Sequence, residues 1–291
     1  YPYLVRVAMG VTGLPFSVIS VVLSLAFFVV FIYLADRLFR QVLGSREALW
    51  AVAIVAFAPV SPMFQVGYAE SLGMVFLTIA LIGLLEKRWW LTGIAIPLAA
   101  LTRPLGVPLT IMMGILMLVA WRSGRDRAPH VWLTVIAAAS AAAWPVIAWV
   151  YTGSASAYLD TEMAWRRPYV GDGTYAWGTG WWQSANWWFP DIAVWVLAGV
   201  AVTVIVVAAL PTTRRLGSVL TVWSWGYLGY LVLVLFPQSS IFRLLAPMFP
   251  LAGSIARNRT ASVFAVVAGI IGQFVWLDWC WSVQGSDWTP P

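Results

Sequence analysis

Glu70, Arg103 and Arg243 are the residues whose types and spacing best suit chemistry, because each interrupts a long apolar stretch. A helix rises about 1.5 Å per residue, so the chain length between each charge and the nearest charge cluster gives its depth. Counting in this way places them about 24, 22 and 21 Å from one surface of a hydrocarbon layer about 30 Å thick. This shared depth, in the outer third of the layer, predicts that the three charges line one cavity.

Two arginines and a carboxylate in such a cavity suit a substrate that carries a phosphate. Arginine forks bind phosphate oxygens bidentately, and Tyr or Trp rings stack on sugars or line an acyl groove. We expect Arg103 and Arg243 to hold a carrier phosphate, while Glu70 positions the acceptor or the sugar, or serves as a fallback general base. This scheme requires no metal.

Structural roles for the same charges are the alternatives. The long side chains of Arg103 and Arg243 could reach the outer membrane interface, and Glu70 could stabilise a helix that begins near Ser71 or pair with an arginine. The segment TRPLGVP at 102–108 favours the cavity, because its prolines break helical hydrogen bonding. At that depth, irregular backbone is tolerated only where it is buried in protein or lines water.

The composition indicates the kind of molecule that positions these residues. Of 291 residues, 62% are hydrophobic and only 10% are charged, against roughly a quarter charged in soluble domains. The single Cys280 and single His130 exclude an internal disulfide framework, a clustered thiolate or imidazole metal site and a Cys/His nucleophilic pair. The net charge of +6 is scattered between apolar runs, which argues against a nucleic-acid partner.

Apolar stretches recur along the whole chain and predict an all-α polytopic membrane protein with about ten transmembrane or partly spanning helices. The stretches are 14–35, 48–69, 71–85, 89–102, 104–121, 131–151, 192–211, 216–236, 244–256 and 260–277. Lys and Arg gather in alternate connections. Twelve of the seventeen lie at Arg37, Arg40, Arg46, Lys87, Arg88, Arg122, Arg125, Arg127, Arg214, Arg215, Arg257 and Arg259. They predict a cytoplasmic side there, with the cavity facing outward.

The long polar connection 152–191 is predicted to lie outside the cell membrane. It is rich in aromatic residues, with WGTGWWQSANWW at 177–188. A loop this long is usually functional, whereas the alternative is an interfacial anchor, because Trp favours the headgroup boundary. Its acids Asp160, Glu162 and Asp172 could bind a divalent ion, but their spacing matches no known site. Arg166 and Arg167 could simply meet lipid headgroups.

The chain opens with YPYLVR, without an initiator Met or a signal pattern. We therefore expect 1–291 to be a single membrane domain from which an upstream helix and first outer loop are missing.

Several of these segments resemble one enzyme family. The stretch YAESLGMVFLTIALIGLLEKRWWLTGIAIPLAALTRPLGV at 68–107 resembles the Glu-Ser-Leu and Leu-Thr-Arg signatures of PIG-V-like mannosyltransferases, which belong to the GT-C class. SIFRLLAPMFPLAG at 240–253 is similar to their late Arg-x-x-x-Pro-x-Phe-Pro element, and TGSASAYLDTEMAWRRP at 152–168 to the start of their large loop. The resemblance adds Tyr68, Ser71, Asp160, Trp165 and Arg166 to the expected substrate-binding residues.

The resemblance implies an inverting glycosyltransferase of the cell membrane. It would move a sugar, mannose being the candidate, from a polyprenyl phosphate carrier to a lipid or protein acceptor on the extracytoplasmic face. The carrier lipid is then a substrate and no cofactor is implied. The GT-C catalytic base is typically an Asp of the first outer loop, which this chain lacks, so the chain by itself is expected to be inactive. A transporter or flippase of a lipid-linked or anionic substrate stays open, because broken helices with charges near the midplane also build transport sites. The long outer loop and the lack of an internal repeat favour the enzyme.

Overall fold

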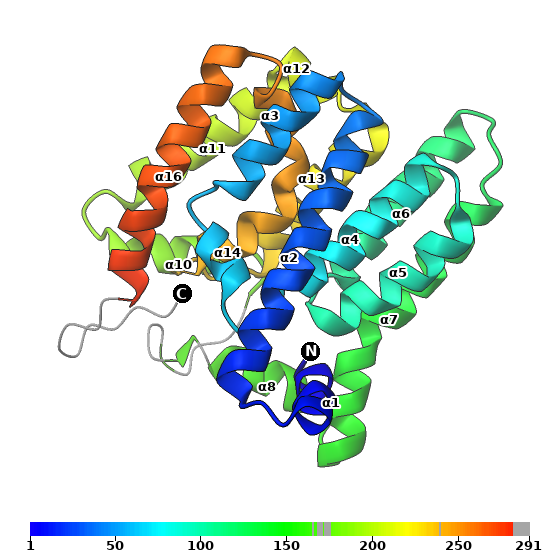
Figure 1. The fold of residues 1–291 in the computed structure, drawn as a ribbon, viewed down its shortest axis with the longest axis vertical. Coiled ribbons are helices and arrows are strands. Elements are labelled where there is room, and N and C mark those ends of the chain that lie inside the picture. Colours follow the sequence, from blue (N-terminus) through cyan, green and yellow to red (C-terminus); the bar gives the residue numbers. More distant parts are fainter. Residues whose placement is uncertain (165, 168–170, 172–175, 239, 282–291) are drawn as a thin grey trace.

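The protein is helical throughout the part that the structure describes. The computed structural model describes residues 1–291 except 165, 168–170, 172–175, 239 and 282–291, and no strand occurs within the described ranges. The longer helices run side by side in one bundle (Figure 1). The prediction of an all-α protein is therefore confirmed.

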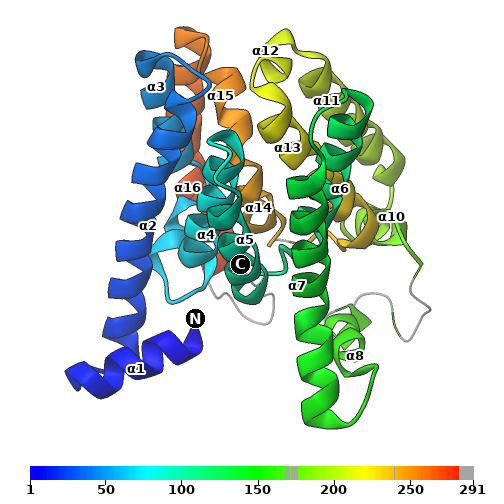
Figure 2. The ribbon, with the colours of Figure 1, turned by 90° about the vertical axis from the view of Figure 1, so that its right-hand side faces the viewer.

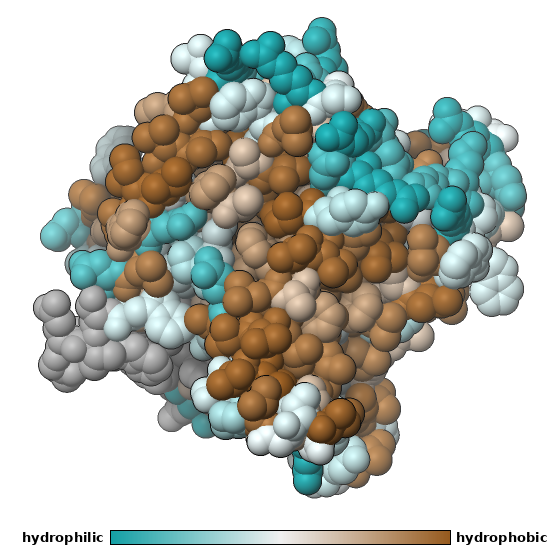
Figure 3. Space-filling model, viewed as in Figure 1, coloured by the Kyte–Doolittle hydropathy of each residue, from teal (hydrophilic) through white to brown (hydrophobic). Residues whose placement is uncertain are grey.

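Among the described residues, four helices are long and apolar enough to cross a membrane: α2 (Phe16–Arg40), α7 (Ala128–Thr152), α13 (Gly217–Val234) and α16 (Arg259–Trp281). Shorter apolar helical segments accompany them, namely α4 (Glu70–Leu85), α5 (Trp89–Thr102), α6 (Gly106–Arg122), α11 (Ala193–Ala209) and the stretch Ile241–Ile255. This combination is that of a membrane-embedded helical protein. Figure 3 shows the apolar surface covering the middle of one face.

Apolar helices occupy two different environments here. Helix α4 is buried on nearly all sides, and it packs against α2 and α5 in the middle of the bundle. Helix α11 is equally apolar, yet Ala193 is its one buried residue. A helix that is apolar all round lies either in a protein core or in a membrane, and this molecule contains both kinds.

Small residues bring the central helices close together. A Cβ on Gly83 of α4 would lie 2.5 Å from Oγ1 of Thr92 on α5, and one on Gly106 of α6 would lie 2.6 Å from Cα of Ala141 on α7. Without a hydrophobic driving force between helices in lipid, this close backbone approach is a main source of packing energy.

Two of the predicted crossings are not single helices. The stretch 48–69 forms α3 (Ser45–Ala56), a turn and the 3-10 helix η1 (Ser61–Gln65), and 244–256 covers the end of α14 (Ile241–Leu245), then η2 (Ala246–Leu251) and α15 (Ala252–Ile255). Prolines interrupt both, because they lack the N–H that a helix interior needs.

Gly13, with φ 70°, ends α1 (Pro2–Thr12), which lies across the end of α2 (Figure 2).

The described part of the connection 152–191 contains two helices. Helix α7 continues to Thr152, α8 (Ala157–Ala164) follows, and the aromatic segment forms α10 (Thr179–Trp188). A short helix, α12 (Pro211–Arg214), joins α11 to α13.

The basic clusters lie together at one end of the bundle. Arg37 of α2 is 2.6 Å from Glu86, which is also 3.0 Å from Arg88. The Trp89 ring, next to Arg88, packs on His130, which follows the cluster of Arg122, Arg125 and Arg127 in the chain. Arg257 is 3.9 Å from Glu47, and its guanidinium donates to the carbonyl of Arg215. These two contacts join the basic residues near 46, 215 and 257. Hydrophilic surface gathers where α2 ends and α3 begins (Figure 3).

Candidate anion-binding site

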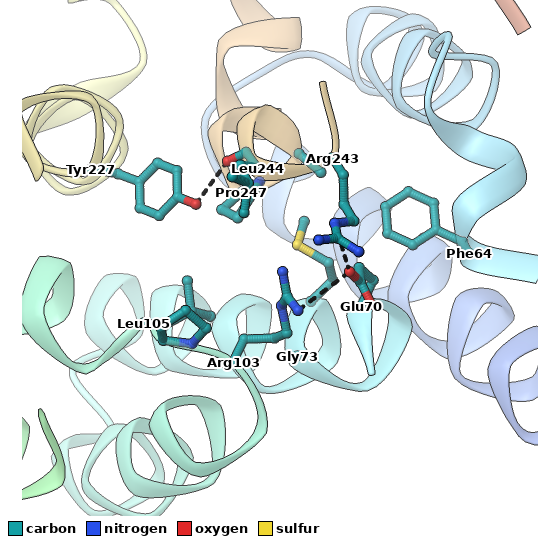
Figure 4. A pocket seen from close by; sticks show the side chains of 12 residues that line it. Phe64, Glu70, Gly73, Arg103, Leu105, Tyr227, Arg243, Leu244 and Pro247 are labelled. Carbon is teal, nitrogen blue, oxygen red and sulfur yellow. Dashed lines mark hydrogen bonds and ion pairs between the residues drawn. The ribbon is translucent and has the colours of Figure 1, made fainter. Parts of the chain in front are cut away.

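Glu70 lies at the centre of the site, as the first residue of α4. A carboxylate in the first turn is favoured there by the helix dipole, and no side chain caps this helix otherwise. The residue is only 5% exposed. Its Oε1 lies 3.4 Å from Nη1 of Arg103 and 3.4 Å from Nε of Arg243, so the three charges expected at one depth do meet (Figure 4).

Arg103 comes from the break between α5 and α6. It follows the last residue of α5 with φ −142° and ψ 158°, because Pro104 disfavours the helical conformation of the residue before it. The side chain then crosses α4 at Gly73, where an added Cβ would lie 2.7 Å from Cγ of Arg103. Gly73 therefore gives Arg103 its path to Glu70, a role that nothing in the local sequence indicates.

Arg243 comes from the broken segment after α13. Its guanidinium carbon lies 5.6 Å from the centre of the Tyr68 ring, a cation–π contact. Two bonds from α13 hold the segment in place: the Tyr227 hydroxyl donates to the carbonyl of Leu244, and the Trp223 indole donates to that of Pro247, both at 2.7 Å. Tyr227 and Trp223 were not expected at the site, since nothing in their local sequence signals these long-range bonds.

A small cavity lies between these elements. Its lining residues are Phe64, Glu70, Gly73, Met74, Arg103, Pro104, Leu105, Tyr227, Arg243, Leu244, Ala246 and Pro247. The volume is about 30 Å³, which is room for about two water molecules.

The electrostatics of the cavity are unbalanced. Among the described residues that line it, two guanidinium groups face one carboxylate, which leaves one surplus positive charge. The separations of 3.4 Å exceed the 2.7–2.9 Å of charge-assisted hydrogen bonds. Within the described part of the chain, neither oxygen of Glu70 accepts a hydrogen bond. The cavity can therefore attract an anion to its arginines and a hydroxyl donor to its carboxylate.

Other expected site residues lie elsewhere. Ser71 is buried and donates to the carbonyl of Phe64 at 2.9 Å, which stabilises the turn before α4. Asp160 lies on exposed α8 and accepts a hydrogen bond from Ser156. Arg166 donates to the carbonyl of Val234. Trp165 is outside the described residues. Apart from Arg103 and Arg243 themselves, Tyr68 is the one expected substrate-binding residue that contacts the three charges in the described structure.

Helix α8 forms a local cluster of its own. Burial raises the pKa of the Tyr158 hydroxyl, and the neighbouring carboxylate of Glu162 acts in the same direction.

The residues that the structure describes contain no group of three His, Cys, Asp or Glu placed to hold a metal ion. Asp172 is not among them.

Comparison with known protein families, curated proteins and solved structures finds no match for this chain. The function is therefore inferred from the geometry of the charged cavity.

Proposed function

We propose that this protein is a glycosyltransferase of the cell membrane, which moves a sugar, with mannose as the candidate, from a polyprenyl phosphate carrier to a lipid or protein acceptor. The observation that carries the proposal is the pair of arginines that share one buried carboxylate among apolar helices. Such intramembrane charges are costly and mark functional sites by default.

The charge of the cavity suits this donor. A polyprenyl phosphosugar is a phosphodiester with one negative charge, which equals the surplus left by Arg103, Arg243 and Glu70. Guanidinium forks match phosphate oxygens in geometry. The unused acceptor sites on Glu70 suit hydroxyl groups of a sugar or an acceptor.

The reaction would be an inverting displacement. An acceptor hydroxyl oxygen attacks the anomeric carbon, the bond from that carbon to the phosphate oxygen breaks, and the phosphate leaves with the electron pair. The arginines stabilise the charge that develops on the leaving phosphate. Glu70 positions the hydroxyl and is the fallback acceptor for its proton.

The arrangement of the bundle supports an outward-facing site. With the basic clusters at one end taken as cytoplasmic, Glu70 lies toward the extracytoplasmic side, as do α8 and α10. About ten transmembrane or partly spanning helices would then cross or enter the bilayer. The likeness of 68–107 to PIG-V-like, GT-C class mannosyltransferases supports the same reaction.

A transporter or flippase of the same lipid is the second candidate. It is favoured by the broken helical segment α14–η2–α15, which carries Arg243. Discontinuous helices beside charges are a recurrent feature of transport sites.

Mass spectrometry of lipid products distinguishes the two. The full-length protein is incubated with polyprenyl phosphomannose and a membrane lipid extract, and wild type is compared with Arg103→Ala and with the control Arg214→Ala from the basic end. We expect a mannosylated product that falls about 100-fold in Arg103→Ala and is unchanged in the control. No transfer from any polyprenyl-linked sugar, together with uptake of unmodified substrate into vesicles, would establish the transporter instead.

A further inference from the structure

The outward end of α13 is covered by hydrogen-bond donors from Arg166 and from the residues 178–184. The last carbonyls of a helix lack partners within the helix, and α13 ends at Val234. The donors are the guanidinium of Arg166 to Val234, the backbone N–H of Gly178 to Leu233 at 2.8 Å, the indole of Trp181 to Leu231 at 3.1 Å, and the hydroxyl of Ser184 to Pro237. Helix α10 therefore binds the main chain of α13 and of the residues that follow it.

The contact is close as well as polar. A Cβ on Gly180 would lie 2.4 Å from the carbonyl oxygen of Leu235, so α10 rests directly on this backbone. Ser184 is only 3% exposed, which places its hydroxyl in the interior of the contact. A buried hydroxyl needs its partner, because leaving it unpaired carries a desolvation penalty.

This contact leads along the chain to Arg243. Pro237, the acceptor for Ser184, is followed by Gln238, whose carbonyl accepts the N–H of Ile241 at 2.9 Å, where α14 begins. Arg243 is in that helix. The segment is thus held by α10 before Arg243 and by Tyr227 and Trp223 of α13 after it.

We propose that α10 is the positioning element of Arg243 and that Ser184 is its positioning residue. The Ser184 hydroxyl fixes the backbone at Pro237, which sets where α14 begins and where the guanidinium of Arg243 meets Glu70. The inference rests on the proposed function in one respect: it takes Arg243 as a ligand of the carrier phosphate.

Hydrogen–deuterium exchange of the ligand-free protein tests the positioning role. We expect Ser184→Ala to raise amide exchange in Ile241–Leu251 about threefold to tenfold, the worth of one hydrogen bond, while α4 is unchanged. Ser184→Thr keeps the hydroxyl and should restore the slow exchange. Asn186→Ala is the matched control, because the side-chain hydrogen bond of Asn186 stays within α10. Unchanged exchange in Ile241–Leu251, or an equal increase in α4, overturns the proposal.

Binding of polyprenyl phosphate, measured by microscale thermophoresis in detergent, tests whether the effect acts through Arg243. We expect Ser184→Ala to weaken binding about threefold to tenfold in the wild-type background, and to add nothing in an Arg243→Ala background. The same additional loss in both backgrounds overturns action through Arg243. Altered exchange without any binding of polyprenyl phosphate by wild type contradicts the glycosyltransferase and leaves the positioning of Arg243 established.

Discussion

The two ends of the bundle use the same kinds of charge in opposite ways. At the basic end, Arg37 and Glu86 approach to 2.6 Å, with side chains 45% and 20% exposed. In the cavity, Glu70 is 5% exposed and lies 3.4 Å from each of two arginines. Exposed pairs contribute little to stability even when short, whereas buried charges are costly unless their geometry is excellent. The cavity geometry is poor for stability alone, which is why we attribute it to binding.

Removing the shared carboxylate should produce the largest effect on stability. Glu70→Ala leaves two arginines facing each other in a largely buried site, so we expect a loss of about 3–5 kcal/mol in the free energy of unfolding. Thermal unfolding in detergent, calibrated by denaturant titration, measures it. Glu86→Ala at the basic end should lose under about 1 kcal/mol. Equal losses in the two variants would remove the contrast between the ends.

Replacing Arg103 with lysine tests whether phosphate binding needs a planar guanidinium or only a positive charge. Arg103→Lys retains a cation but loses the planar fork, so we expect polyprenyl phosphate to bind about tenfold more weakly. Arg37→Lys at the basic end should leave binding unchanged. Thermophoresis with both variants measures the two affinities. If Arg103→Lys binds normally, a point charge is sufficient and the bidentate contact is wrong.

Blocking the path of Arg103 should have a smaller effect through geometry alone. Gly73→Ala places a methyl group 2.7 Å from Cγ of Arg103, and we expect a severalfold loss of transfer activity although alanine is the better helix former. Gly114→Ala is the matched control, because a Cβ there meets nothing within 4 Å. Product formation by the two variants gives the comparison. Full activity in Gly73→Ala would show that Arg103 adapts without cost.

Salt should produce the smallest difference. Raising the ionic strength from about 0.1 to 1 M shortens the screening length from about 10 to 3 Å, which weakens exposed pairs more than buried ones. The stability loss caused by Glu86→Ala should therefore shrink in high salt, whereas that caused by Glu70→Ala should persist. Unfolding measurements at both salt concentrations provide the test, and a parallel decline would indicate that the cavity is open to solvent ions.

The sequence is informative about the charges because depth along a helix is a local property. Counting residues from the charge clusters was enough to bring Glu70, Arg103 and Arg243 to one level, and Pro104 marked the break that carries Arg103. The interruption of 48–69 was missed, although Pro59 and Pro62 lie in it. There, high average hydropathy outweighed the local effect of the prolines.

The supporting residues could not be found in the same way. Gly73 matters because the side chain of Arg103 crosses α4 beside it, and Tyr227 matters because α14 returns to α13 after the chain breaks. Ser184 bonds to a residue 53 positions away. Such partners depend on how helices are placed in three dimensions, and one sequence contains no periodicity or spacing that encodes them.

The two sides of the contact between α10 and α13 should differ in how well they tolerate amino-acid substitutions. The acceptors are main-chain carbonyls, which every amino acid carries, so the side chains at 231–237 are replaceable without loss of an acceptor. Two of the donors, the indole of Trp181 and the hydroxyl of Ser184, belong to particular side chains and vanish with most replacements. A library of substitutions should therefore show tolerance at the exposed acceptor position 233 and intolerance at 181 and 184, whereas Leu231 is constrained by its own burial.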